Sequence, residues 1–231
     1  MSKMDSSDED EVESYQYKVL IMGDGAVGKT SLINRYCRDG FAQSYKQTIG
    51  VDFFNKKIVF PGGVSATLQI WDIGGQQIGG KMLSNYVFGC HAVCFVYDST
   101  NSESFKNVDD WYSFVRDSTK NEPKPPYLAL IGNKMDLPQR QVKNEKHNLY
   151  ATDHKMTPFL VSAKSGEKVN SMFQRVAADL AGVTLTKAET DVADKTVTAA
   201  IVQHPAAPVP FGTALTRVNN EEKQDDGCVL M

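Results

Sequence analysis

The chain has 231 residues, of which 41% are hydrophobic and 23% are charged, and its formal net charge at pH 7 is −3. This length and balance favour one soluble globular domain with tails, and exclude a disordered, fibrous or membrane-spanning chain. The acidic balance argues against nucleic acid as a partner. The four cysteines and four histidines do not fall at zinc-like spacings, so we expect neither disulfides nor a zinc site.

Residues 1–14 are acidic and rich in serine. They offer no apolar surface to offset the entropy of ordering, so they are predicted to be disordered. They also lack the apolar core of a signal peptide, and no later stretch is apolar for long enough to cross a bilayer. We therefore expect a cytoplasmic protein that contacts membranes only through a lipid.

Strands and helices are predicted to alternate over residues 15–183. Short apolar runs predict strands buried on both faces at 17–22, 92–97, 127–131 and 157–161. Residues 51–60 and 64–71 alternate polar and apolar residues around a Pro-Gly-Gly turn, which predicts an antiparallel hairpin. Helical spacing predicts helices at 29–38, 102–118, 143–154 and 169–180. The predicted fold is α/β: a three-layer open sheet, mostly parallel with one antiparallel edge strand.

Residues 23–30 (GDGAVGKT) fit the phosphate-loop pattern GxxxxGK[ST] between a predicted strand and a predicted helix. Glycines let backbone N–H groups turn toward phosphates, Lys29 supplies a charge for the β and γ oxygens, and Thr30 offers a hydroxyl to Mg²⁺. ATPases and GTPases share this loop, so it does not name the base. The alternative is a glycine-rich turn that binds nothing. The predicted phosphate-binding residues are Gly23, Asp24, Gly25, Ala26, Val27, Gly28, Lys29, Thr30 and Ser31, with Lys29 also a candidate catalytic residue.

Two further motifs follow strands at the carboxyl edge of the predicted sheet, where open α/β folds bind ligands. In NKMD, Asp136 can accept hydrogen bonds from N1–H and the exocyclic amine of guanine, whereas adenine presents an acceptor at N1. In SAK, backbone amides are predicted to bind the guanine carbonyl, with a lysine beside the base. The predicted base-binding residues are Asn133, Lys134, Asp136, Ser162, Ala163 and Lys164.

The order and spacing of these motifs resemble the Ras superfamily over residues 17–180. TIGVDFF, LQIWD and VYDSTNSESFKNVDDW resemble the Rab family, and DFF, WDIGGQ, IGGKML and the single-cysteine tail resemble its divergent subgroup numbered twenty-eight. The resemblance implies a P-loop NTPase of the small G-domain type over residues 15–183, monomeric, binding GTP or GDP with Mg²⁺. It also implies traffic between membranes at endosomes or at the base of cilia or flagella.

The same resemblance assigns the switch residues. Thr48 binds Mg²⁺ only with a γ-phosphate present, Asp72 holds the metal through water, and Gly75 senses the γ-phosphate. Thr30, Thr48 and Asp72 are thus the predicted metal set. Gln76 orients the attacking water, unless it is a plain loop glutamine. Phe41 covers the guanine face, unless it is a core aromatic, and Tyr45 is a further nucleotide contact.

No arginine resembles a built-in finger, so hydrolysis is expected to be slow and to need a GTPase-activating protein. The family's DTAGQE is here DIGGQQ at residues 72–77. Gly74 predicts a looser switch II in the GDP form, and Gln77 predicts a different exchange geometry or a dedicated exchange factor. The main alternative is a GTP-binding scaffold without significant hydrolysis. NKMD and SAK disfavour a P-loop kinase or ATPase.

Two surface features complete the resemblance. Phe53, Trp71 and Tyr86 match the aromatics that Rab proteins present to effectors, with a purely structural role as the alternative. Cys228 begins a C-a-a-X box (CVLM), whose terminal methionine favours farnesyl. Residues 184–231 show no clear period and are predicted to be a flexible tail. A single prenyl group beside acidic residues predicts reversible membrane association and a prenyl-binding carrier.

Overall fold

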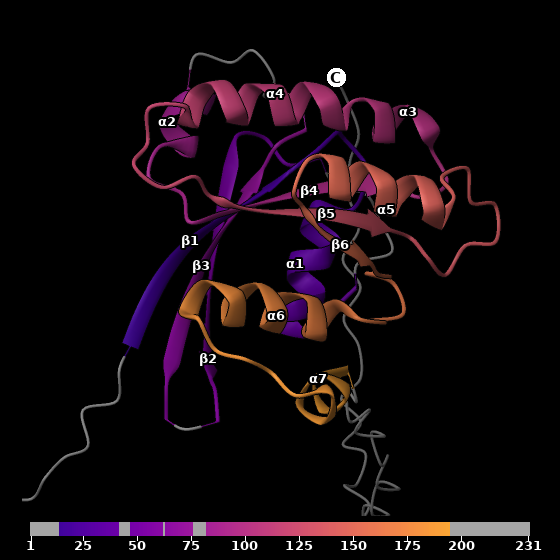
Figure 1. Cartoon of the computed structure of the whole chain (residues 1–231). Coiled ribbons are helices and arrows are strands. Elements are labelled where there is room, and N and C mark those ends of the chain that lie inside the picture. The colour runs from indigo at the N-terminus through magenta and orange to yellow at the C-terminus, as the bar shows by residue number, and fades with distance from the viewer. Residues whose placement is uncertain (1–13, 42–46, 62, 76–81, 195–231) are drawn as a thin grey trace, which may run out of the picture. The chain divides into compact units, whose positions relative to one another are not determined.

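The computed structural model describes residues 14–41, 47–61, 63–75 and 82–194. It contains one six-stranded sheet and the helices that cover it (Figure 1). The strands are β1 (Ser14–Met22), β2 (Val51–Val59), β3 (Ser65–Ile73), β4 (Ala92–Asp98), β5 (Tyr127–Asn133) and β6 (Thr157–Leu160). The helices are α1 (Lys29–Arg38), α2 (Leu83–Val87), α3 (Ser102–Lys106), α4 (Val108–Thr119), α5 (Asn144–Asp153), α6 (Val169–Ala181) and α7 (Lys187–Asp194).

The strand order in the sheet is β2-β3-β1-β4-β5-β6. β2 runs antiparallel to β3, and every other neighbouring pair is parallel. The hairpin between β2 and β3 closes through a hydrogen bond of 2.8 Å from the N–H of Phe60 to the carbonyl of Val64. The predicted α/β sheet with one antiparallel edge strand is therefore confirmed.

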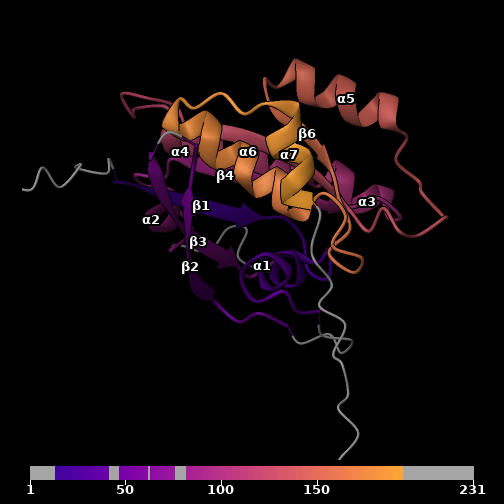
Figure 2. The ribbon, with the colours of Figure 1, turned by 90° about the horizontal axis from the view of Figure 1, so that it is seen from below.

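Helices cover both faces of the sheet, which explains why its central strands are almost continuously apolar. α1 and α6 lie on one face and α2 to α5 on the other, while α7 lies against α6 (Figures 1 and 2). Successive residues of β1 point to opposite faces, so Val19 and Ile21 pack in the core on the α1 face. Leu20 and Met22 pack in the core on the other face. All four side chains are fully buried.

One predicted helix is two helices in the structure. The segment predicted as 102–118 divides at Asn107 into α3 and α4. Asn101 starts α3 because its side chain accepts hydrogen bonds from the N–H groups of Glu103 and Ser104. Asn107 is the C-cap of α3 and the N-cap of α4, and its backbone N–H donates to the Glu103 carbonyl at 2.9 Å.

Two helices were not predicted. α2 has five residues, too few to show a period, and is held by the buried Leu83 and Val87. α7 corrects the prediction that residues 184–231 form a flexible tail, because residues 187–194 are helical. Thr186 and Glu189 start α7 with a reciprocal cap, in which Glu189 Oε2 accepts from the Thr186 N–H at 2.7 Å.

Residues 1–13 and 195–231 lie outside the part of the chain that the structure describes, so the disorder predicted for them stays a prediction. Within the described part, no helix combines the length and the apolar character needed to cross a bilayer.

Candidate nucleotide and metal site

The candidate site lies at the carboxyl ends of β1, β4, β5 and β6. The phosphate-loop sequence follows β1 and leads into α1, as predicted. Asp98 ends β4, Asn133 ends β5, and Ser162 follows β6. Because parallel strands end at the same edge, segments more than a hundred residues apart in the chain come together here.

Two glycines of the loop are required by its backbone and its neighbours. Gly23 has φ of 139°, and a Cβ there would lie 2.1 Å from the carbonyl oxygen of Val96. Gly28 has φ of 98°, and a Cβ there would lie 2.4 Å from Asn133 Nδ2. Any side chain at either position would push the loop away from β4 or β5. The loop is therefore closely packed against the strands that carry the other motifs.

Lys29 lies in the first turn of α1 with only 6% of its surface exposed. Its ammonium donates hydrogen bonds to the carbonyls of Gly23 at 2.7 Å and Asp24 at 2.6 Å. Burial lowers the pKa of Lys29 to about 8, while the nearby carboxylates of Asp72 and Asp24 oppose this shift. Phosphate oxygens beside this ammonium would favour its charged form.

The three residues predicted to hold the metal meet at one point, although 18 residues separate Thr30 from Thr48 and 42 separate Thr30 from Asp72. The Thr30 hydroxyl donates to Asp72 Oδ2 at 2.5 Å. The Thr48 hydroxyl lies 2.8 Å from Thr30 Oγ1 and 3.4 Å from Asp72 Oδ2. Two hydroxyls and one carboxylate are oxygen donors, the type that Mg²⁺ prefers.

Asp72 supplies a direct test of whether a cation fits these residues. The residue is fully buried, and its Oδ1 atom has no hydrogen-bond partner among the residues that the structure describes. Burial raises the pKa of the Asp72 carboxyl, while the hydrogen bond from Thr30 opposes this. A cation would satisfy the orphaned oxygen and the buried charge together, so the residues fit Mg²⁺. The described residues contain no group of three or more His, Cys, Asp or Glu suited to a metal, so phosphate and water oxygens would complete the shell.

Asn133 joins the phosphate loop to the loop after β6. Its Nδ2 donates to the carbonyl of Val27 at 2.9 Å, and its Oδ1 accepts from the backbone N–H of Ala163 at 3.0 Å. The side chain is almost fully buried. Asn133 therefore fixes the position of the base-binding loops relative to the phosphate loop.

Two residues of the SAK motif, Ser162 and Lys164, orient the side chain of Asp136. The hydroxyl of Ser162 donates to its Oδ1 at 2.6 Å, and the ammonium of Lys164 lies 4.0 Å from its Oδ2. The resulting carboxylate has lone pairs left for two further donors. This is the acceptor pattern that guanine needs and adenine cannot match.

Lys134 reaches back across the site. Its ammonium donates to the carbonyl of Ala26 at 2.9 Å and lies 2.6 Å from Asp98 Oδ2. Asp98 was not predicted as a site residue, although it ends an apolar run in the way that Asp72 does. Burial raises the pKa of the Asp98 carboxyl, but the hydrogen bonds from Lys134 and Thr100 outweigh this effect and hold that pKa below its ordinary value.

Asn107 and Trp111 were also not predicted. Asn107 Nδ2 donates to Asp24 Oδ2 at 2.7 Å, and Trp111 Nε1 donates to Asp24 Oδ1 at 3.0 Å. Both oxygens of this phosphate-loop carboxylate are therefore bonded to the junction of α3 and α4. The two residues belong to the segment that carried the Rab resemblance, but no local pattern in it indicates a partner more than 80 residues away.

Gly74 and Gly75, which follow β3, pack against the segment that carries Thr48 and against the phosphate loop, respectively. A Cβ at Gly75 would lie 2.2 Å from the Gly25 nitrogen, so Gly75 adjoins the phosphate loop. The N–H of Gly74 donates to the Gly50 carbonyl at 2.9 Å, and a Cβ at Gly74 would lie 2.8 Å from the Thr48 carbonyl oxygen. The segment that carries Thr48 and Gly50 and the segment that carries Gly74 are therefore in direct contact through their backbones.

Five predicted residues remain. Ser31 is half-buried in the first turn of α1, and Phe41 follows that helix with 37% of its surface exposed. Tyr45, Gln76 and Cys228 lie outside the described residues. The contacts proposed for these five residues with nucleotide, water or lipid stay predictions.

The three aromatics predicted to face effectors form one cluster. Phe53 and Trp71 are paired across β2 and β3, with ring centroids 4.6 Å apart at 79°. Tyr86 of α2 lies 6.0 Å from Trp71, and the ammonium of Lys18 lies 4.1 Å above the Trp71 ring. Phe53 is 56% exposed, so the cluster has an accessible apolar surface.

Comparison with known proteins agrees with this geometry. A family model described as the Ras family matches residues 18–181. "Ras-related protein Rab-28" of Caenorhabditis elegans is 40% identical over 205 residues, which cover 88% of this chain and 83% of the relative. "Ras-related protein Rab7" of Drosophila melanogaster is 38% identical, covering 69% of this chain and 78% of the relative. "Ypt/Rab-type GTPase YPT7" of Saccharomyces cerevisiae is 36% identical, covering 69% and 79%.

Proposed function

This chain belongs to the Ras family of small GTPases and, within that family, is similar to Rab proteins, and we propose that the site described above is its guanine-nucleotide switch. The observation that carries the proposal is the meeting of Thr30, Thr48 and Asp72 at the end of the phosphate loop. One of these residues lies in each of the three segments expected to respond to nucleotide. The proposed G domain spans residues 15–183, with α7 packed beside it.

Each group of residues has a separate task in this proposal. The loop N–H groups and Lys29 bind the phosphates, Thr30, Thr48 and Asp72 hold Mg²⁺, and Asp136 selects guanine. Bound Mg²⁺ neutralises charge on the phosphates. Gln76 orients the attacking water. Positioning and electrostatics then account for most of the catalysis, since phosphoryl transfer needs little covalent chemistry from the protein.

The switch depends on contacts that need the γ-phosphate. Thr48 and the Gly75 N–H would be held by the γ-phosphate and Mg²⁺, and hydrolysis would release them. Hydrolysis is slow without a supplied arginine, so a GTPase-activating protein sets its rate and an exchange factor reloads the site. Effectors read the ordered state at Phe53, Trp71 and Tyr86, in intracellular membrane traffic at endosomes or at the ciliary or flagellar base.

A change of base preference tests the proposed site. Asp136→Asn replaces an acceptor by a donor facing the exocyclic amine of guanine, so we expect GDP affinity to fall at least a hundredfold. Xanthosine diphosphate carries a carbonyl where guanine carries the exocyclic amine, so the Asp136→Asn variant should bind xanthosine diphosphate more tightly than the unsubstituted chain does. The matched control is Asp153→Asn, an exposed carboxylate on α5. Unchanged GDP and xanthosine diphosphate affinities in Asp136→Asn would remove guanine recognition from this residue.

Membrane association is proposed to depend on Cys228. One prenyl chain is a marginal anchor, and the acidic residues before it are repelled by anionic lipid. The protein should therefore exchange between cytoplasm and membrane with the help of a prenyl-binding carrier. Cys228→Ser is expected to move the protein to the soluble fraction, with Cys37→Ser as the control. A membrane fraction equal to that of the unsubstituted chain would contradict the proposal.

A further inference from the structure

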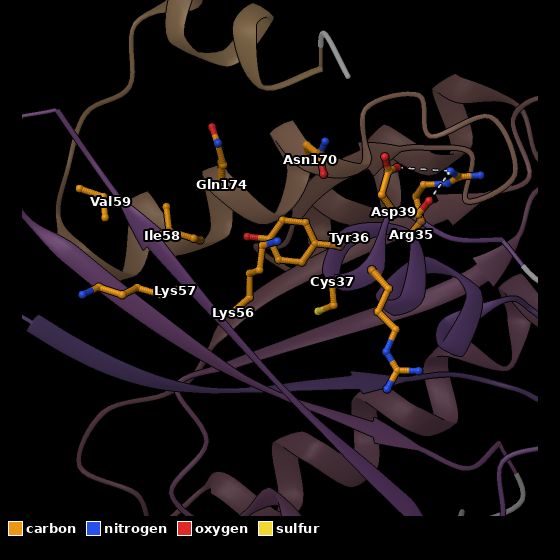
Figure 3. A pocket seen from close by; sticks show the side chains of 11 residues that line it. Arg35, Tyr36, Cys37, Asp39, Lys56, Lys57, Ile58, Val59, Asn170 and Gln174 are labelled. Carbon is orange, nitrogen blue, oxygen red and sulfur yellow. Dashed lines mark hydrogen bonds and ion pairs between the residues drawn. The ribbon is translucent and has the colours of Figure 1, made fainter. Parts of the chain in front are cut away.

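A basic groove, drawn in Figure 3, lies on the face of the sheet that α1 and α6 cover. It has a volume of about 540 Å³ and is bounded by the end of α1, by β2 and by α6. Figure 3 shows the side chains of Tyr36 and Lys56 in its centre. Its lining residues are Arg35, Tyr36, Cys37, Arg38, Asp39, Lys56, Lys57, Ile58, Val59, Asn170 and Gln174.

The lining contains four cations and one carboxylate. Asp39 is paired with Arg35 at 3.5 Å, and Arg35 also donates to the carbonyls of Ala163 and Lys164. The other three cations have no carboxylate partner in the described part of the chain. They are Arg38 and Lys56, on the α1 face of the sheet, and Lys57, whose side chain lies on the other face of the edge strand β2 and points away from Tyr36 (Figure 3).

Aromatic rings hold two of these unpaired cations in place. The Lys56 ammonium lies 5.5 Å from the centroid of the Tyr36 ring, and the Arg38 guanidinium lies 5.2 Å from the centroid of the Phe54 ring. Such contacts fix the charges without neutralising them. The groove is therefore a fixed concentration of positive charge on a chain whose net charge is −3.

The chain itself carries a complementary segment next to this groove. Residues 5–13 (DSSDEDEVE) contain six carboxylates and no basic residue, and we call them the acidic arm. The arm ends where β1 begins at Ser14, which is paired with Ser65 of β3, and Ser65 is paired with Val59 of β2. Since neighbouring strands lie about 4.8 Å apart, Ser14 is only ~10 Å from Val59 in the groove lining.

The length of the arm is sufficient to reach the unpaired cations. Lys57 lies two residues along β2 from Val59, a further distance of about 7 Å. An extended chain spans about 3.4 Å per residue, so five residues before Ser14 cover ~17 Å. A short tether of this kind gives an effective concentration in the millimolar range, above that of a free acidic ligand in dilute solution.

We propose that the acidic arm binds in the basic groove of the same molecule. Its carboxylates would pair with Arg38 and Lys56 inside the groove and with Lys57 at the edge of the sheet, and would remove the uncompensated positive charge. α1 and β2 flank residues 39–50, which include Thr48. An occupied groove would thus bridge the two ends of this segment.

Zero-length carbodiimide cross-linking of the full chain tests the proposal, because it joins only carboxylates and amines in direct contact. We expect links from the arm to Lys56 or Lys57 at about 0.01 M salt, where the Debye length is ~30 Å, and their loss at about 1 M salt, where it is ~3 Å. Lys120 and Lys124 serve as control amines, because both are exposed, as Lys57 is, and are no less accessible than the half-buried Lys56. Links spread equally over the four lysines would overturn the proposal.

A binding competition distinguishes the arm from an external anion. In a variant with Asp8→Asn, Glu9→Gln, Asp10→Asn and Glu11→Gln, an occupied groove becomes accessible, so inositol hexakisphosphate should bind at least fivefold more tightly than to the unsubstituted chain. Lys56→Gln with Lys57→Gln should abolish that gain, whereas Lys120→Gln with Lys124→Gln should retain it. Equal affinity in the neutralised-arm variant and the unsubstituted chain would show that the groove takes external anions, and would overturn the proposal.

Discussion

Trp111 Nε1 donates a hydrogen bond of 3.0 Å to Oδ1 of Asp24, across 87 residues of chain. The indole is fully buried in the core beneath α4, whereas the carboxylate belongs to the phosphate loop. Asn107 bonds the other oxygen of the same carboxylate. The phosphate loop is therefore positioned by the α3–α4 junction as well as by β1 and α1.

Replacing Trp111 with phenylalanine should loosen the phosphate loop. A hydrogen bond to a charged group contributes about 1.5–3 kcal/mol, so we expect GDP to dissociate about tenfold faster from Trp111→Phe. Fluorescent GDP release measures this rate. Tyr112→Phe, a neighbouring aromatic on α4 that does not contact the loop, is the control. If GDP is released from Trp111→Phe at the same rate as from the unsubstituted chain, the hydrogen bond between Trp111 and Asp24 does not position the loop.

Replacing Asp72 with asparagine should uncouple nucleotide binding from Mg²⁺. The change keeps the shape but removes the buried charge that the cation would balance, so EDTA should accelerate GDP release from the unsubstituted chain and have little effect on the variant. Asp52 lies directly opposite Asp72 in the β2–β3 register. Asp52→Asn should therefore respond to EDTA normally, and an equal response of both variants would count against a metal role for Asp72.

Placing alanine at Gly74 should disturb switch I. Its Cβ would lie 2.8 Å from the Thr48 carbonyl oxygen and 3.1 Å from that of Gly50. Overpacking of this kind costs about 1–3 kcal/mol, so a non-hydrolysable GTP analogue should lose at least fivefold more affinity than GDP. Gly40→Ala is the control, because its nearest neighbour would be 3.9 Å away. Equal losses for both nucleotides would separate Gly74 from the γ-phosphate response.

Loss of Gln76 should separate nucleotide binding from turnover. Leucine cannot orient water, so Gln76→Leu should bind GTP normally and hydrolyse it at least tenfold more slowly in single-turnover measurements. Gln69→Leu, on the exposed side of β3, is a matched control. If Gln76→Leu and the unsubstituted chain hydrolyse GTP equally slowly, the scaffold interpretation replaces the timed switch.

His147 should make the stability of the domain depend on pH. The ring is fully buried, its Nδ1 lies 3.0 Å from the Tyr97 hydroxyl, and its Nε2 has no hydrogen-bond partner within the described part of the chain. Burial lowers the pKa of His147 from 6.5 to about 4. The unfolded chain therefore binds a proton at His147 more tightly than the folded chain does. The stabilising contribution of the buried neutral ring is complete above pH 6.5 and is lost as pH falls toward 4.

Lowering the pH from 7.5 to 5 should therefore reduce the free energy of unfolding by about 2 kcal/mol through His147 alone. Urea unfolding at the two pH values measures it. His147→Gln should remove that part of the pH dependence, whereas His154→Gln should keep it. An identical pH dependence in His147→Gln and the unsubstituted chain would contradict the prediction.

Local sequence was sufficient where neighbouring residues act together. GDGAVGKT predicted its loop, and the buried runs predicted the four strands that position the site, because glycine geometry and strand burial are properties of short segments. The same reasoning failed for α2, which is too short to show a period, and for the division at Asn107. It also missed the reciprocal cap from Thr186 to Glu189 that starts α7.

The sequence by itself determined the chemistry available to this protein: a phosphate loop, a carboxylate for guanine, and oxygen donors for a metal. Only the tertiary structure decided which distant groups meet, because strand order and register set contacts between residues far apart in the chain. It brought Thr48 and Asp72 to Thr30, and joined Asp24 to Trp111. It also left Lys56 and Lys57 without carboxylate partners among the described residues, beside the start of β1.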